Sequence, residues 1–244
     1  MPFTFSHPAI VLPAKYLPRK LYSWTGLVIG SLVPDFEYFL RMKVESKYSH
    51  TLAGVFWFDL PLGILLAFIF HNIVRNKLIY NLPRFLKSRL LAFNNFNWNN
   101  YFRKNSFVVI VSIIIGALSH ILWDSFTHGS GFFVQTIHSL KTNVNVFGIQ
   151  IFIFKVLQHG STIVGGLIII YEVLKLPKNN NVLSSFGFRY WTLVFVLTLI
   201  IVSARFATGL EYKLYGDLIV TGISAGLVSI ILTSWVTKPN INWC

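Results

Sequence analysis

The chain has 244 residues, of which 54% are hydrophobic and only 12% are charged. A soluble domain carries about 25% charged residues, so this composition excludes an ordinary soluble protein and indicates a membrane protein. The net charge of +13 does not indicate a nucleic-acid partner, because basic loops that orient membrane helices explain it. The single cysteine, Cys244, excludes an internal disulfide and a cysteine-rich metal site.

Five segments are long and apolar enough to span a bilayer. They cover approximately residues 52–71, 106–124, 149–174, 191–208 and 218–236. A sixth segment, 21–40, has the length but carries Pro34 and two acidic residues near its end. It therefore either crosses as a sixth span or forms a broken or re-entrant element. We expect an all-α fold, a polytopic membrane helix bundle of five to six transmembrane helices, that forms one integral membrane domain over residues 1–244.

Lysine and arginine residues indicate the orientation of the spans. Segment 72–105 is rich in both and is expected to be a basic cytoplasmic loop, as is the turn at 175–190. The connections at 125–148 and 209–217 carry few basic residues and are expected outside. The C-terminus is therefore expected in the cytoplasm, in a multi-pass protein of the cytoplasmic (inner) membrane surrounded by membrane lipids. The same rule favours a crossing by 21–40, because a crossing places more basic residues inside.

The stretch SHILWDSFTHGSG at residues 119–131 ends an apolar span with a polar row. His120, Asp124 and His128 are spaced four residues apart, so they lie on one face of a helix. Titratable groups at membrane depth are costly and indicate a function. A lone histidine at a helix end is usually interfacial, and an aspartate there can simply cap the helix or face water.

The expected topology brings further polar residues to the same membrane face. Asp35 and Glu37 end the segment before His50, and His50 precedes the next span on the outer side. Three segments thus deliver histidines and carboxylates to one place. Nitrogen and oxygen donors without sulfur suit zinc, manganese or iron, with zinc as the default. For this combination we favour binding of a divalent metal over a structural role.

Four motifs also carry a family resemblance, and the first three lie in or near the N-terminal motif region 1–50. They are MPFTFSHPA, GSLVPDFEYFL, YSHTLAG with FDLPLG, and ALSHILWDSFTHGSGF. The chain resembles an uncharacterised family of bacterial multi-spanning membrane proteins with a domain of unknown function. More distantly it is similar to inner-membrane proteins classed as metal-dependent hydrolases, and through them to the zinc-dependent phospholipase C and P1 nuclease fold.

This resemblance implies a ligand set: His7, Asp35, His50, His120 and Asp124, with His128 as a further candidate. The soluble enzymes add a second His-x-x-x-Glu pair, whereas here His159 is followed four residues later by Ile163. We therefore expect one or two ions rather than three. Six spans would place His7 inside, whereas a role in the site needs it outside or deep within a dip.

These observations predict a membrane-embedded metal-dependent hydrolase that acts on a lipid or lipid-linked phosphoester at the outer face of the membrane. Glu37 is expected as general base or as hydrogen-bond partner of a histidine ligand. Arg205 is expected either to hold a phosphate or to anchor its helix at the interface. The alternatives are a non-enzymatic protein, namely a cation or small-solute transporter, or a scaffold whose polar cluster only fixes helix packing.

Overall fold

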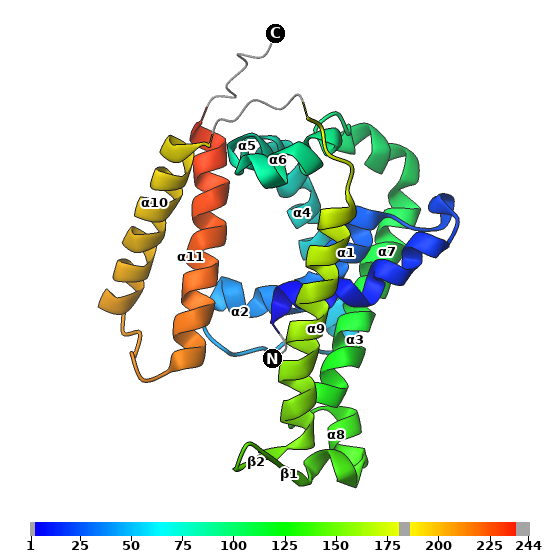
Figure 1. Ribbon diagram of the computed structural model, residues 1–244, viewed down its shortest axis with the longest axis vertical. Helices are drawn as coiled ribbons and strands as arrows, with labels where there is room; N and C mark the ends of the chain where they lie inside the picture. Colours follow the sequence, from blue (N-terminus) through cyan, green and yellow to red (C-terminus); the bar gives the residue numbers. More distant parts are fainter. Residues whose placement is uncertain (1–2, 181–185, 238–244) are drawn as a thin grey trace. The chain divides into compact units, whose positions relative to one another are not determined.

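The computed structural model describes residues 3–180 and 186–237, and nearly all of its regular structure is helical (Figure 1). The α-helices are α1 (Trp24–Leu32), α2 (Phe36–Arg41), α3 (Leu52–Gly54), α4 (Leu60–Ile69), α5 (Arg75–Asn81), α6 (Arg84–Leu90), α7 (Trp98–Thr127), α8 (Phe132–Thr136), α9 (Ile153–Lys175), α10 (Phe188–Ala207) and α11 (Tyr215–Val236). Shorter 3₁₀ or π segments are η1 (Thr4–Tyr16), η2 (Arg19–Leu21), η3 (Val33–Asp35), η4 (Val55–Asp59), η5 (Phe70–Val74), η6 (Leu91–Phe93) and η7 (His138–Lys141). The strands β1 (Asn143–Val146) and β2 (Ile149–Phe152) form one antiparallel hairpin. The expected all-α fold is confirmed.

Five helical stretches among the described residues are long and apolar enough to cross a membrane. They are Leu52–Asn81, Trp98–Thr136, Ile153–Lys175, Phe188–Ala207 and Tyr215–Val236. The chain is therefore a multi-pass membrane protein. Segment 21–40 is not among them, because α1 ends at Leu32 and the 3₁₀ turn η3 separates it from α2. The break coincides with Pro34, which has no amide hydrogen for a helical bond.

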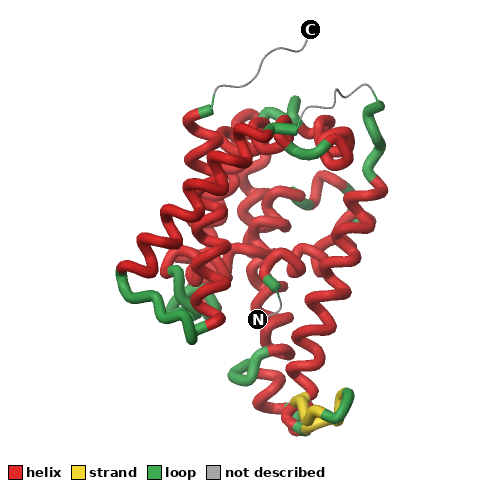
Figure 2. The backbone as a smooth tube through the Cα atoms, turned by 60° about the vertical axis from the view of Figure 1, so that its left-hand side comes forward, coloured by secondary structure: helices red, strands yellow, loops and turns green. Residues whose placement is uncertain are grey.

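Contacts between residues divide the chain into two compact units. The first contains Met1–Asp35, Lys47–Ile64 and Asn105–Leu174, and the second contains Phe36–Ser46, Leu65–Lys104 and Lys175–Cys244. Figure 2 shows that the described residues form mainly helices. The candidate site lies wholly within the first unit. The single domain expected over residues 1–244 stays a prediction.

In the first unit, α1 packs directly against the backbone of α7. A Cβ atom added to Gly26 would lie 2.7 Å from the Cβ of Ser112, and one added to Gly116 would lie 2.7 Å from the amide nitrogen of Ser31. Small residues of this kind let two membrane helices approach closely. The contact is reinforced by the amide of Ser23, which donates to the hydroxyl of Ser112 at 2.8 Å. As a result, the backbone at the end of α1 lies beside α7.

The N-terminal segment η1 packs against α9. The amide of Phe3 donates to the hydroxyl of Thr162 at 3.0 Å, and a Cβ added to Gly165 would lie 2.8 Å from the carbonyl oxygen of Ser6. Side chains at i and i+3 of a 3₁₀ helix lie on the same face. Thr4 and His7 are therefore on one face, and both are buried.

Two regions differ from the elements expected from sequence. The span expected from residue 149 begins at Ile153, because 149–152 pairs as β2 through a turn at Phe147 and Gly148, both with positive φ. Segment 72–105, expected to be a loop, instead contains α5, α6 and the start of α7, which is kinked at Asn105. The side of the membrane that this segment faces stays a prediction.

In the second unit, α10 packs against α11. The hydroxyl groups of Tyr190 and Ser234 are 2.9 Å apart and join the two helices. The indole of Trp191 donates to the carbonyl of Asn81 at 2.8 Å, and the hydroxyl of Ser224 donates to the carbonyl of Phe39. These bonds give hydrogen-bond partners to polar groups for which lipid supplies none.

Candidate metal centre

Four side chains converge in the first unit: Asp35, His50, His120 and Asp124. One ligand atom from each lies within 4.8 Å of all the others. Asp35 lies in η3, His50 precedes α3, and the other two occupy consecutive turns of α7. Three of the four are buried, and the side chain of His50 is 21% exposed. The group could therefore hold a metal ion.

The two ring nitrogens of His120 show how the atoms of the cluster are arranged toward a cation. Its Nδ1 lies 2.8 Å from the carbonyl oxygen of Ser31. A carbonyl only accepts, so Nδ1 carries a hydrogen and the Nε2 of a neutral ring has a lone pair. That Nε2 faces Asp35 Oδ1 at 3.5 Å and Asp124 Oδ2 at 3.3 Å and has no hydrogen-bond partner. A lone pair aimed at two carboxylates is repulsive unless a proton or a cation lies between them.

Asp35 is held by the N-terminal segment. Its Oδ2 accepts a hydrogen bond of 2.6 Å from the hydroxyl of Thr4, and the residue is fully buried. The second oxygen, Oδ1, has no hydrogen-bond partner and lies 3.5 Å from the Nε2 atoms of His50 and His120. One oxygen thus fixes the carboxylate, and the other faces the imidazoles. This division of roles is typical of a metal-ligating carboxylate.

His50 is oriented in the same way as His120. Its Nδ1 lies 3.0 Å from the hydroxyl of Ser49, and its Nε2 lies 3.5 Å from both Asp35 Oδ1 and Asp124 Oδ2. Burial lowers the pKa of His50, but the neighbouring carboxylates of Asp124 and Asp35 outweigh burial and raise the pKa above 6.5. A proton on the ring of His50 would therefore compete with any cation held by this group.

Two more histidines contact the other oxygen of Asp124. His7 Nε2 lies 3.3 Å from Asp124 Oδ1, and His128 Nδ1 lies 3.4 Å from the same atom. The ring of His7 also stacks on that of His120, with centroids 3.8 Å apart. His7 therefore lies beside the cluster. Asp124 therefore joins two groups of histidines, one at each carboxylate oxygen.

Charge balance favours a divalent cation. Two carboxylates with neutral imidazoles carry a charge of about −2, and buried charge is costly unless it is compensated. A divalent ion compensates it, and the nitrogen and oxygen donors match zinc, manganese or iron sites. The residues present thus fit a metal ion.

The comparisons with known proteins give one match. The model of a family described as "Domain of unknown function (DUF4184)" matches residues 1–235. The chain belongs to this family. No curated protein and no solved structure matches it.

Two predicted residues of this DUF4184 chain belong to the second unit. Glu37, expected as general base, is buried, and its carboxylate bonds Arg41 at 2.8 Å and Ser46 at 3.2 Å. Arg205, near the end of α10, donates to the hydroxyl of Thr208 at 3.2 Å. Their roles toward the cluster stay predictions.

Sequence reasoning missed the groups that orient the side chains of the cluster. Thr4 lies three residues before His7 in the motif MPFTFSHPA, but only the histidine of this motif was considered. The position of Thr4 on the same 3₁₀ face as His7 is a signal that could have identified Thr4. The carbonyl of Ser31 carries no such signal, because every residue has a carbonyl and only the close packing of α1 on α7 selects this one.

Proposed function

We propose that the chain is a membrane-embedded metal-dependent hydrolase that acts on a lipid or lipid-linked phosphoester at the outer face of the cytoplasmic membrane. The observation that carries this proposal is the arrangement of His120. Its Nδ1 is fixed by a backbone carbonyl and its Nε2 is aimed, without a hydrogen bond, at two carboxylates. Outer groups that orient imidazole and carboxylate ligands in this way are a general feature of metal sites.

A divalent ion in such a site supplies Lewis-acid polarisation of a phosphoryl oxygen and makes water reactive near neutral pH. The chain contributes Asp35, His50, His120 and Asp124 as the proposed ligands, with His7 and His128 at the second oxygen of Asp124. In the hydrolysis, water gives one proton to a base and its oxygen bonds to phosphorus, the phosphorus–oxygen ester bond breaks, and the leaving alkoxide takes up the proton to form the alcohol. We propose zinc as the ion, with manganese and iron as alternatives.

Proton transfer and phosphate binding are assigned from sequence. Glu37 follows Asp35 by two residues, and we propose it as general base or as partner of a histidine ligand. We propose Arg205 as a phosphate-binding residue because a guanidinium matches phosphate with two parallel hydrogen bonds. Glu37→Gln and Arg205→Lys should both reduce turnover. Metal content should stay unchanged in Arg205→Lys and in Glu37→Gln if Glu37 is the base, whereas weaker metal binding in Glu37→Gln would assign Glu37 as partner of a histidine ligand. Native turnover in either variant would contradict these roles.

The proposed membrane face is tested by topology reporters. Fusions after residue 95 should report the cytoplasm, and fusions near residue 140 should report the outside, because basic residues gather in 72–105. A cytoplasmic location of residue 140 would contradict hydrolysis at the outer face.

The chemistry is tested on purified protein in detergent. Elemental analysis should find stoichiometric metal, and a screen of phospholipids and simple phosphoesters should show turnover that a chelator abolishes. His128→Ala is a graded comparison, because its Nδ1 lies 3.1 Å from the backbone carbonyl oxygen of Asp124 and 3.4 Å from Asp124 Oδ1, and its side chain is 24% exposed. We expect a 10–100-fold loss of activity there, the effect typical of outer residues. Tightly bound metal without turnover on any ester would favour transport, and metal-free protein would favour a scaffold.

A further inference from the structure

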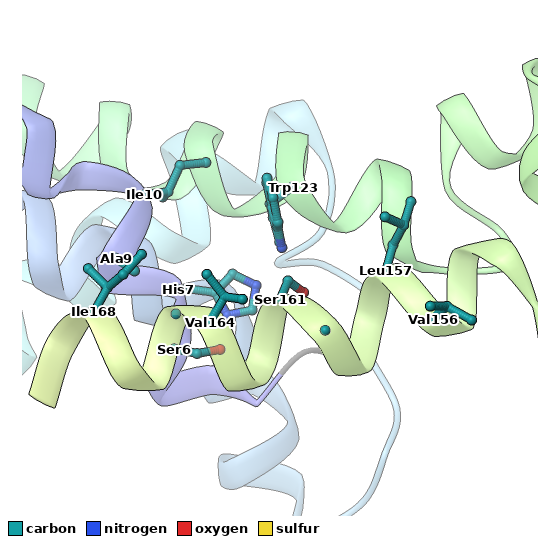
Figure 3. A pocket seen from close by; sticks show the side chains of 12 residues that line it. Ser6, His7, Ala9, Ile10, Trp123, Val156, Leu157, Ser161, Val164 and Ile168 are labelled. Carbon is teal, nitrogen blue, oxygen red and sulfur yellow. The ribbon is translucent and has the colours of Figure 1, made fainter. Parts of the chain in front are cut away.

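A groove with a volume of about 500 Å³ lies beside the cluster in the first unit. Its walls are η1, α7 and α9, and Figure 3 shows its lining: Ala9 and Ile168 at one end, Val156 and Leu157 at the other, and His7 between them. The volume is in the range of about 300–1,000 Å³ that small-molecule sites occupy.

The groove offers almost no polar group to a ligand. The hydroxyl of Ser6 donates to the carbonyl of Phe3 at 2.6 Å, and the hydroxyl of Ser161 donates to the carbonyl of Gln158 at 3.0 Å. Both hydroxyls are therefore used by their own helices. Most other lining side chains are aliphatic or aromatic, and Val164 is 56% exposed. The ligand portion that fits such walls is hydrocarbon.

The position of the groove identifies the source of that hydrocarbon. Helices α7 and α9 belong to two of the segments that are apolar enough to cross a membrane, so the medium around them is lipid. Val156 and Ile168 are twelve residues apart on α9, which corresponds to about 18 Å of helix. One leaflet of a bilayer supplies about 15 Å of hydrocarbon. The groove is therefore about as long as one leaflet is deep, and because His7 lies between its ends, the stretch from His7 to either end has room for part of one acyl chain.

His7 connects the groove to the cluster. Its ring lines the groove, while its Nε2 contacts Asp124 Oδ1 at 3.3 Å. We propose that this groove binds an acyl chain of the lipid substrate and places the ester of that lipid at the metal cluster. This inference rests on the proposed function and specifies it: the substrate is a diacyl or other long-chain lipid rather than a water-soluble phosphoester.

Two glycines on α9 provide a matched pair of variants. A Cβ added to Gly160 or to Gly166 meets no atom within 4 Å, so either position accepts a larger side chain. Gly160 lines the groove and Gly166 is not among its lining residues. Gly160→Leu should fill the groove, whereas Gly166→Leu makes the same change on the same helix outside it.

The test uses a phosphatidylglycerol with a photoreactive diazirine in one acyl chain, added to the purified full-length protein. In the native protein, labelled peptides should cover residues 156–168, and Gly160→Leu should reduce this labelling by about tenfold or more. Gly166→Leu should label like the native protein. Equal labelling of all three proteins, or labelling spread evenly over the apolar faces of α10 and α11, would overturn the proposal.

Metal content is measured in the same samples and separates this inference from the proposed function. Metal-free native protein that still labels selectively in the groove would contradict the hydrolase and leave the lipid site standing. Native protein that holds metal and hydrolyses a soluble phosphoester, but shows no selective labelling, would contradict the lipid site alone.

Discussion

Thr4→Val tests the metal centre by removing the one hydrogen bond that the side chain of Thr4 makes to a proposed ligand; the backbone carbonyl of Thr4, which lies 3.3 Å from His7 Nδ1, is unchanged. The hydroxyl of Thr4 donates to Asp35 Oδ2 at 2.6 Å, and the two residues are 4% and 0% exposed. Valine has nearly the same size but no donor, so Asp35 loses the bond that fixes its carboxylate. A hydrogen bond to a charged group contributes about 1.5–3 kcal/mol, which corresponds to about 10–150-fold in a binding constant.

We therefore expect zinc to bind the Thr4→Val protein about 10–150-fold more weakly, a range close to that of other outer-shell substitutions. The measurement is a titration of metal-depleted protein in detergent, in competition with a chelator of known affinity. Thr4→Ser is the matched control, because it restores a hydroxyl at the same position and should bind nearly as the native protein does. Native affinity in Thr4→Val would refute the reasoning that Asp35 is a ligand oriented from η1.

Three further results are expected. His120→Ala and Asp124→Asn should each abolish stoichiometric metal while the protein still inserts, because each removes a ligand atom; full metal content in both would make the polar row a packing feature. Gly30→Ala should lower the free energy of unfolding by about 1–3 kcal/mol, because the added Cβ would overlap the backbone of α7; an unchanged thermal midpoint would contradict this close packing. Metal affinity should fall as the pH is lowered, because the pKa of His50 is raised and its ring must lose a proton before metal binds. The affinity should level off above that raised pKa. A pH-independent affinity would exclude His50 as a ligand.

The membrane helices could be predicted because their signal is local. Long apolar runs indicate spans wherever they occur, and Pro34 indicated the break that leaves α1 short. The boundary at residue 149 was wrong because strand pairing overrode hydrophobicity: Ile149 and Ile151 look like part of a span but pair with β1. Composition alone does not distinguish an apolar strand from the first turn of an apolar helix.

The site was predictable only in part, because some of its contacts lie within one helix and others join separate helices. The spacing of His120 and Asp124 follows from helix geometry, so their shared face could be read directly from the sequence. The approach of Asp35 to that face depends on glycine packing between α1 and α7, which becomes visible only when both helices are placed. The position of His7 could not be predicted, because the contact between His7 and Asp124 joins residues 117 positions apart and becomes visible only when η1 and α7 are both placed. Whether 21–40 crosses the membrane stays a prediction.

The separation of His7 and Asp124 in the sequence has a consequence for how the protein is made. The two contacting residues are 117 positions apart, and ribosomes add about 5–20 residues per second, so on the order of 6–23 s pass between their synthesis. During that interval η1 has no α7 on which to stack. The cluster therefore cannot assemble before about half of the 244 residues have been synthesised, and with the proposed metal ligands we expect nascent chains arrested before residue 124 to retain no zinc.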